Sequence, residues 1–420
     1  MQTNLAIAIL LLTFFVLITI RVPIALAIGV SSIVTCIYLD IPVEMVFQNM
    51  ISGVNSYSLM AIPFFILMGD IMSRGGIARR LINLAYATVG WMRGGLSMVT
   101  VLASMLFGAV SGSSTACTAT LGPIMIPEME KKGYDKKFAT DITMASSVTG
   151  LLIPPSHNMV IYSMVAGGIS VGALFIAGIL PGVILGLALM IYSYIVAKKN
   201  NYAVGEKFDI KVFGKAFVDA LWGLFSIIIV VIGVTTGIIT ATESAALACV
   251  WSFIVSVFIY KEMTMKDIFE VATSSAKTVA MIILLIATSN AFGWLLAYLK
   301  VPALVSSSIY GFSTNPYVIL VMINILLLVL GTLMDMSPII LIATPILLPI
   351  AQSIGVDPVQ FGTLLILNLG VGLLTPPVGA TLFLGSAISD IKFEKLAVSM
   401  KYIYSIDVSY ICTTNIASSS

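Results

Sequence analysis

The sequence predicts an all-α polytopic membrane protein, and three observations lead to this prediction. Hydrophobic residues make up 59% of the 420 residues and charged residues only 10%, against about 25% charged residues in an average globular chain. A water-soluble protein could not bury so many apolar side chains, so membrane lipid must surround most of the chain. Apolar runs of about 20 residues, long enough to cross a bilayer, recur along it. A block of glycine and proline motifs occurs twice, which indicates two related halves.

Charge and motif content exclude several other classes. The formal net charge is +2, which provides no basic field, so we expect no nucleic-acid partner. The four cysteines are far apart and His157 is the only histidine, which argues against a disulfide framework or a zinc site. No Walker A motif is present, because Asp209 stands where a glycine would precede Gly214-Lys215. The chain therefore has no phosphate-binding motor of its own.

Apolar runs and polar breaks divide the chain into six segments. In order, they are N-terminal spans (1–95), a first repeat with a hairpin and a broken helix (96–197), a lysine-rich connector (198–216), further spans (217–315), a second repeat (316–392) and an atypical polar tail (393–420). The connector is expected in the cytoplasm. Within the first repeat we predict separate spans at 159–176 and 178–197, and overlapping GxxxG patterns from Gly178 to Gly186 predict close helix packing.

The repeat has a constant offset. Pro123 and Pro345 are 222 positions apart (345 − 123 = 222). The same shift relates Pro127 to Pro349, Gly133 to Gly355, Asp135 to Asp357, Gly150 to Gly372, and Pro154-Pro155 to Pro376-Pro377. Residues 128–137 of the first copy include four lysines, whereas residues 350–359 include none. Because basic connectors stay in the cytoplasm, we predict copies of opposite orientation, an inverted-topology repeat.

Each copy contains a proline pair inside an apolar helical run. A proline has no N–H, so each pair should free two backbone carbonyls four residues earlier. These carbonyls belong to Gly150, Leu151, Gly372 and Leu373. Since unpartnered carbonyls are costly in lipid, we predict two discontinuous helices that bind a hard cation through oxygen, with the hydroxyls of Ser156 and Thr375 close by. A kink that serves only packing is the alternative.

A second polar interruption precedes each proline pair. In the first copy it consists of Ser111, Gly112, Ser113, Ser114 and Thr115. In the second copy it contains Gly331, Asp335 and Ser337. Such residues suit the tips of two re-entrant hairpins, where exposed N–H groups can meet an ion or a carboxylate. Hydroxyl groups that join neighbouring helices are the alternative for the first cluster.

Three further residues are candidates. Asp335 is a carboxylate in an apolar run, which is by default functional, although it can also cap the helix that follows. Glu243 opens an apolar helix after a threonine-rich turn and is expected to interact with the helix dipole. Asn158 follows Ser156 and His157, and the histidine is either a hydrogen-bonding side chain or a proton carrier.

Several motifs together support a resemblance. They are Ser111-Gly-Ser-Ser114, Leu121-Gly-Pro-Ile-Met-Ile-Pro127, Lys132-Gly-Tyr-Asp135, Ile153-Pro-Pro-Ser156, Thr240-Ala-Thr-Glu-Ser-Ala-Ala246, Asp335-Met-Ser-Pro338 and Leu373-Leu-Thr-Pro-Pro377. Over about residues 1–396 the chain resembles the large membrane subunit of tripartite ATP-independent periplasmic (TRAP) transporters. The resemblance implies sodium-coupled uptake of an organic acid, of the C4-dicarboxylate or sialic acid type, through the bacterial inner membrane. It also implies a small TRAP membrane subunit and a periplasmic substrate-binding protein as partners.

The resemblance further implies an elevator-type transporter, in which a transport domain moves against a scaffold. Segments 96–197 and 316–392 would form the transport domain, and segments 1–95 and 217–315 the scaffold. Sodium ions would lie between each hairpin tip and its broken helix, at Ser111, Gly112, Ser113, Gly150, Pro154, Gly331, Asp335, Gly372 and Thr375. The substrate would contact Ser113, Ser114, Thr115, Ser156, Asp335 and Ser337.

The chain departs from the resembled family in two ways. It begins directly at the large subunit's first span, so the small subunit is not expected to be fused to it. After Lys395 it is polar where the family has a further apolar span, and we assign no function to these residues. Two alternatives stay open, an organic-anion symporter without a binding protein and a non-catalytic membrane scaffold. An enzyme is not expected, because the chain has one histidine and no HExxH motif.

Overall fold

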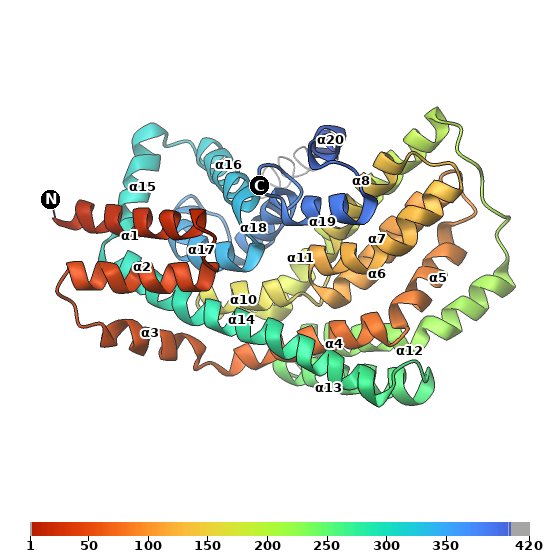
Figure 1. The fold of residues 1–420 in the computed structure, drawn as a ribbon, viewed down its shortest axis with the longest axis horizontal. Coiled ribbons are helices and arrows are strands. Elements are labelled where there is room, and N and C mark those ends of the chain that lie inside the picture. Colours follow the sequence, from red (N-terminus) through yellow and green to blue (C-terminus); the bar gives the residue numbers. More distant parts are fainter. Residues whose placement is uncertain (1, 402, 405–420) are drawn as a thin grey trace.

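The part of the chain that the structure describes is helical throughout, which confirms the all-α prediction. The computed structural model describes residues 2–401, 403 and 404, and within them the only extended pairing is a β-bridge between Arg93 and Val204. One group of helices includes the long α14, which packs on α2, α3 and α4, and it lies along the left and lower sides of the molecule in Figure 1. It comprises α1 (Gln2–Thr19), α2 (Ile24–Tyr38), α3 (Glu44–Val54), α4 (Ala61–Arg74), α5 (Ile77–Val89), α12 (Ile210–Thr235), α13 (Ala241–Ile254) and α14 (Met265–Tyr298).

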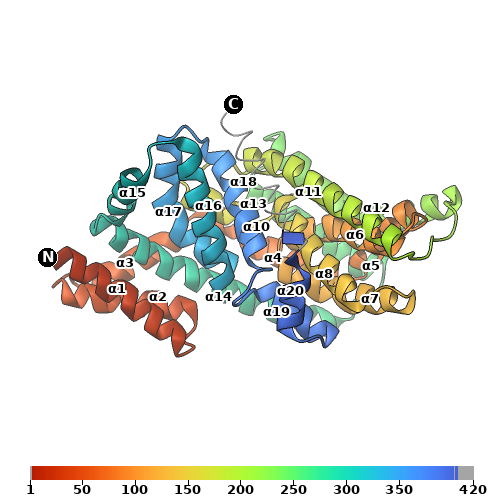
Figure 2. The ribbon, with the colours of Figure 1, turned by 90° about the horizontal axis from the view of Figure 1, so that it is seen from above.

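A second group of helices packs on the first, and α15 (Val301–Phe312) connects the two. Its members are α6 (Gly95–Ser111), α7 (Ser114–Lys131), α8 (Lys136–Ser147), α9 (Thr149–Leu152), α10 (His157–Val165), α11 (Val171–Lys199), α16 (Pro316–Leu333), α17 (Met336–Ser353), α18 (Pro358–Gly372), α19 (Ala380–Ser389) and α20 (Phe393–Ser399). In Figure 2, α16, α17 and α18 lie side by side, and α6, α7 and α8 form a corresponding cluster. Each cluster thus contains one helical hairpin and the first part of one interrupted helix.

Six helices in the described part of the chain are long and apolar enough to cross a membrane. They are α11, α12, α13 with its extension to Ile259, α14, α16 and α17, and the pair α3 and α4, bent by 63°, would make a seventh span. Several other apolar helices have only 10–17 residues. At 1.5 Å per residue these fall short of about 30 Å of hydrocarbon.

Matched positions of the sequence repeat have matched local structures. Gly133 and Gly355 follow α7 and α17 with φ of 83° and 90°, a backbone conformation that glycine adopts without strain. Asp135 and Asp357 then cap α8 and α18, accepting hydrogen bonds from the backbone N–H groups of Phe138 (3.4 Å) and Val359 (2.8 Å). The repeat therefore encodes the same helix–turn–helix twice, while the orientation of the two copies in a bilayer stays a prediction.

Two glycine pairs bring each hairpin against its interrupted helix. A Cβ atom added to Gly150 would lie 2.2 Å from Cα of Gly108, and one added to Gly372 would lie 2.6 Å from Cα of Gly331. At both crossings backbone meets backbone with no side chain between them. The predicted ion-site residues Gly150, Gly331 and Gly372 thus serve as close-packing positions.

The GxxxG prediction is confirmed, since α11 packs on the first helix break through its glycines. A Cβ atom added to Gly178 would lie 2.3 Å from the carbonyl oxygen of Leu152. One added to Gly182 would lie 2.5 Å from the side chain of Ile153. These glycines give the broken segment a protein neighbour in place of lipid.

The predicted span at 159–176 is wrong. Helix α10 ends at Val165, and α11 is a separate, continuous helix of 29 residues. The reason is local, because Gly167 and Gly168 have φ of 91° and 83° and end the helix. Ser170 then caps α11 through its side chain.

The connector at 198–216 is shorter than predicted, because α11 continues to Lys199 and α12 begins at Ile210. It is also anchored, since Val204 pairs with Arg93 in the β-bridge. The expected polar tail begins with the short helix α20 and continues beyond the described residues. Its described part packs on the fold, with Leu396 fully buried and the Tyr404 hydroxyl donating to the Leu374 carbonyl at 2.5 Å.

Replacing Gly150 by alanine tests the backbone crossing. The new Cβ would meet backbone atoms of Gly108, which cannot rotate away, so we expect a loss of about 1–3 kcal/mol of stability. Thermal unfolding of the purified protein measures this. The control is Gly214→Ala on α12, where a Cβ meets nothing within 4 Å. Equal melting temperatures for the two variants would contradict the crossing.

Candidate functional site

The first hairpin tip joins α6 to α7 through two residues, Gly112 and Ser113. Gly112 follows Ser111 with φ of 59° and reverses the chain. Ser113 then caps α7, accepting a hydrogen bond from the Ala116 N–H at 3.3 Å, and its hydroxyl also contacts that of Thr115 at 3.0 Å. The tip therefore presents hydroxyl groups at the N-terminus of a helix, where the dipole favours an anion.

The second tip joins α16 to α17 and carries a carboxylate. Oδ1 of Asp335 accepts the Met336 N–H at 2.9 Å and caps α17, so the capping role is confirmed. The carboxylate is nevertheless exposed and lines a cavity. A structural and a functional role are thus compatible for this residue.

The second helix break satisfies its own backbone, which corrects one prediction. The carbonyl of Gly372 accepts the Thr375 N–H at 2.9 Å, and the carbonyl of Leu373 accepts the Thr381 N–H at 3.2 Å. The Val378 N–H also reaches back to the carbonyl of Thr332 at 3.0 Å. Residues 373–379 turn back on themselves, so these carbonyls are not orphaned by the prolines, although each keeps a second lone pair.

The hydroxyls predicted beside the two breaks differ in their surroundings. Thr375 donates to the carbonyl of Val371, four residues earlier in α18, at 2.9 Å. Ser156 is fully buried, and its hydroxyl has no hydrogen-bond partner among the described residues. A buried hydroxyl without a partner is costly, so Ser156 retains an unused oxygen ligand beside the first break.

Asn158 joins the two halves of the repeat. Its side-chain nitrogen donates to the carbonyl of Gly112 in the first tip at 3.0 Å. Its side-chain oxygen accepts from the hydroxyl of Ser337, at the start of α17, at 3.3 Å. The residue is 3% exposed, so both bonds are shielded from water. A single amide therefore holds both hairpin tips to α10.

Ser114 makes a second connection between the halves. Its hydroxyl lies 2.5 Å from that of Ser147 on α8 and 2.9 Å from that of Thr381 on α19. It is almost fully buried, and the structure places it behind the tip and away from the cavity. The alternative interpretation, a hydroxyl that joins helices, describes its contacts.

A cavity of about 920 Å³ lies where the two tips face α4 and α14. Five predicted site residues line it, namely Ser111, Ser113, Thr115, Asp335 and Ser337. The other predicted site residues lie behind this surface, in packing or capping positions: Gly112, Ser114, Gly150, Pro154, Ser156, Asn158, Gly331, Gly372 and Thr375. Glu243 forms a capping box with Thr240 on the surface (2.8 and 3.2 Å), which confirms its helix-terminal role.

The lining of the cavity also includes polar residues that the sequence analysis missed. They are Asp70 and Ser73 on α4, Thr120 on α7 and Thr278 on α14. Asp70 could have been found, because it is an acid inside an apolar run. Of the described residues that line the cavity, two are aspartates and none is a lysine or arginine. An anionic solute therefore meets a negative cavity.

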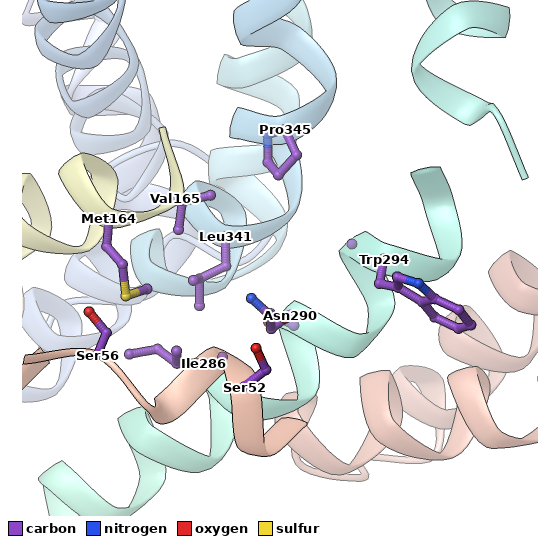
Figure 3. Close-up of a pocket in the computed structure, with 12 residues that line it drawn as sticks. Ser52, Ser56, Met164, Val165, Ile286, Asn290, Trp294, Leu341 and Pro345 are labelled. Carbon is purple, nitrogen blue, oxygen red and sulfur yellow. The ribbon is translucent and has the colours of Figure 1, made fainter. Parts of the chain in front are cut away.

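A second pocket, of about 360 Å³, follows along the same helices. Figure 3 shows it between α3, α10, α14 and α17, with Ser52, Ser56 and Asn290 as polar lining. Helices α14 and α17 contribute to both pockets, from Thr278 and Asp335 in the first to Trp294 and Leu341 in the second. The two pockets thus lie in succession along the contact between the helix groups.

The fold is that of a polytopic helical membrane protein. It matches the solved structure of the YdaH transporter of Alcanivorax borkumensis with a TM-score of 0.62 at 12% sequence identity, over 88% of this chain and 87% of that chain. The sequence narrows the class further, because residues 11–417 match the family model described as the tripartite ATP-independent periplasmic transporter, DctM component. The chain belongs to this family of TRAP transporter large permeases.

Curated relatives agree with this assignment. The protein YgiK of Salmonella typhimurium is 42% identical over 91% of this chain and 89% of its own length. The C4-dicarboxylate TRAP transporter large permease of Rhodobacter capsulatus is 37% identical (90% and 89%), and the sialic acid TRAP transporter large permease of Vibrio cholerae is 37% identical (83% and 82%). The chain is therefore a multi-pass protein of the inner membrane, in a family of transporters and not of enzymes.

Asn158→Ala tests whether one amide holds the two tips. It removes two buried hydrogen bonds between distant segments, so we expect a loss of about 1–3 kcal/mol, measured by thermal unfolding. The control is Asn49→Ala, since Asn49 bonds only to the Met45 carbonyl one turn away at 2.7 Å. If both variants have the same melting temperature, Asn158 does not hold the tips in place.

Proposed function

We propose that this chain is the large subunit of a sodium-coupled importer of an organic acid. It would work with a small membrane subunit and a periplasmic binding protein, as family membership implies. The cavity in front of the two tips carries the proposal. It has two helix N-termini that suit a carboxylate, and its lining includes two aspartates and no lysine or arginine.

Electrostatics explains why such a cavity needs a cation. Two like charges about 4 Å apart repel by about 4 kcal/mol at an effective dielectric constant near 20. An organic anion near Asp70 and Asp335 would therefore bind weakly unless cations entered with it. Coupling to a cation gradient follows from this charge balance.

The oxygen chemistry around the tips favours sodium as that cation. Hard cations take carbonyl and hydroxyl oxygens, and the tips and breaks supply such groups within protein. Ser156 offers a buried hydroxyl without a partner in the described chain, and Gly112 and Gly372 offer carbonyls that use one lone pair each. Among the described residues no cluster of three His, Cys, Asp or Glu side chains occurs, so the donors at hand are mostly neutral oxygens.

The movement we propose is an elevator with inverted repeats. The two tips and breaks are tied together through Asn158 and Ser114, which favours motion as one body. Two successive pockets lie along the contact with α14. A transporter with alternating access could open one pocket to each side of the membrane. The relatives' names mention a C4-dicarboxylate and sialic acid. Since both are organic acids, we propose an organic acid as the substrate of this chain.

Uptake should require an inward sodium gradient. We expect liposomes with this chain, its small subunit and the loaded binding protein to accumulate the acid in sodium but not in choline. ATP should make no difference. Uptake that is unchanged in choline would refute sodium coupling, and equal uptake without the binding protein would favour the simpler symporter. No uptake in any condition would favour a scaffold.

Asp335→Asn separates the charge of Asp335 from its capping role. Asparagine caps helices nearly as well as aspartate, so α17 should still begin at the same residue. Loss of the negative charge should reduce sodium-driven uptake about tenfold or more and raise the sodium concentration at half-maximal rate. Expression and small-subunit binding should stay normal. The control is Asp390→Asn, at an exposed position with φ of 55°, and equal uptake by both variants would assign Asp335 to capping alone.

A further inference from the structure

Asp70 is a carboxylate outside the sodium and substrate sites that the sequence predicts. It lies half-buried on α4 and lines the large cavity. Its Oδ2 accepts a hydrogen bond from the buried hydroxyl of Ser275 on α14 at 2.5 Å. A carboxylate can accept about four hydrogen bonds, and Ser275 uses only one of these positions.

Helix α4 holds Asp70 close to the first hairpin. A Cβ atom added to Gly69 would lie 3.3 Å from Cα of Ser111 in the tip. One turn later, the hydroxyls of Ser73 and Thr120 lie 3.1 Å apart. Asp70 lies between these two contacts along α4, and it lines the same cavity as the tip residues Ser111 and Ser113.

The nearby arginines pair with glutamates outside the cavity, although Arg74, one turn after Asp70 on α4, also attracts the Asp70 carboxylate. Arg74 pairs with Glu270 at 3.1 Å, and Arg79 and Arg80 pair with Glu262 at 2.5 and 2.7 Å. Partial burial alone would raise the pKa of Glu262, but the two arginines outweigh it and lower that pKa. None of these arginines lines the cavity, and neither does Lys277.

We propose that Asp70 makes this cavity select hydroxylated monocarboxylates over dicarboxylates. The inference rests on the function proposed above. The single carboxylate of the solute lies at the tips with the sodium ions, and its far end faces Asp70 on the other wall. Hydroxyl groups at that end donate to Asp70 and exchange hydrogen bonds with Ser73 and Thr278. A second carboxylate there meets a like charge, and no lysine or arginine lines the cavity to bind it.

The size of the cavity agrees with such a solute. At about 920 Å³ it lies near the upper end of the range of about 300–1,000 Å³ found for pockets of drug-sized ligands. A six-carbon sugar acid therefore fits with its hydroxyl groups hydrated or bound. Discrimination by Asp70 is a property of the membrane subunit, separate from any selection by the binding protein.

Four six-carbon acids test the inference on the purified full chain. Gluconate has one carboxylate and hydroxyl groups, glucarate has two carboxylates and hydroxyl groups, and hexanoate and adipate are the corresponding acids without hydroxyls. Ligand-dependent thermal stabilisation is measured in sodium and in choline. We expect gluconate to stabilise the protein at concentrations about tenfold lower than those that the other three acids require.

Asp70→Asn should then strengthen the binding of glucarate about tenfold relative to that of gluconate, because the amide removes the like charge. The control is Asp40→Asn, an exposed aspartate with φ of 55°, which asparagine tolerates. Three results would overturn the inference. Glucarate or adipate could stabilise the wild type as well as gluconate does, both variants could show the same preference, or none of the acids could stabilise the protein. Sodium-dependent binding of adipate would overturn it and leave the proposed function intact. If the preference for gluconate is the same in choline as in sodium, the proposed role of Asp70 is supported and sodium coupling is contradicted.

Discussion

The structure depends on one constraint, that a helix interrupted within lipid must find partners for its backbone inside the protein. At the second break, Thr375, Val378 and Thr381 supply N–H groups to carbonyls of the break and of the neighbouring hairpin. Tip and break therefore form one hydrogen-bonded unit. The glycine crossings at Gly150 and Gly372 have the same effect, since they exclude both lipid and water from the gap between two backbones.

The close packing of tip and break determines where a solute can bind. With backbone against backbone behind the tips, the remaining space lies in front of them, against α4 and α14. Asn158 connects both tips from behind, so the surface that faces the cavity comes from two distant parts of the chain yet is held as one piece. This favours a division between a body that carries the solute and a wall against which it moves.

Much of this could be predicted from the sequence, because the repeat marks where the backbone departs from the helix. Asp135 and Asp357 cap equivalent helices, and both proline pairs form breaks. The sequence could not give the partners of the freed groups, which depend on how residues 373–379 turn back. It also could not tell which hydroxyl of a cluster faces the cavity, as Ser113 does and Ser114 does not. Contacts between distant segments decide both.

The two aspartates of the cavity differ in what offsets their charge. Asp335 sits at the N-terminus of α17, bonded to a backbone N–H, where a partial positive charge of about one half stabilises it. Asp70 lies within α4, where it accepts a hydrogen bond from the neutral hydroxyl of Ser275 and is attracted to Arg74 one turn later. The charge of Asp335 is therefore offset at the tip itself, and that of Asp70 from the wall of α4 and α14. Under the proposed function an anion would bind at the tips, where helix N-termini and cation ligands lie, and so to the part of the protein that we propose to move.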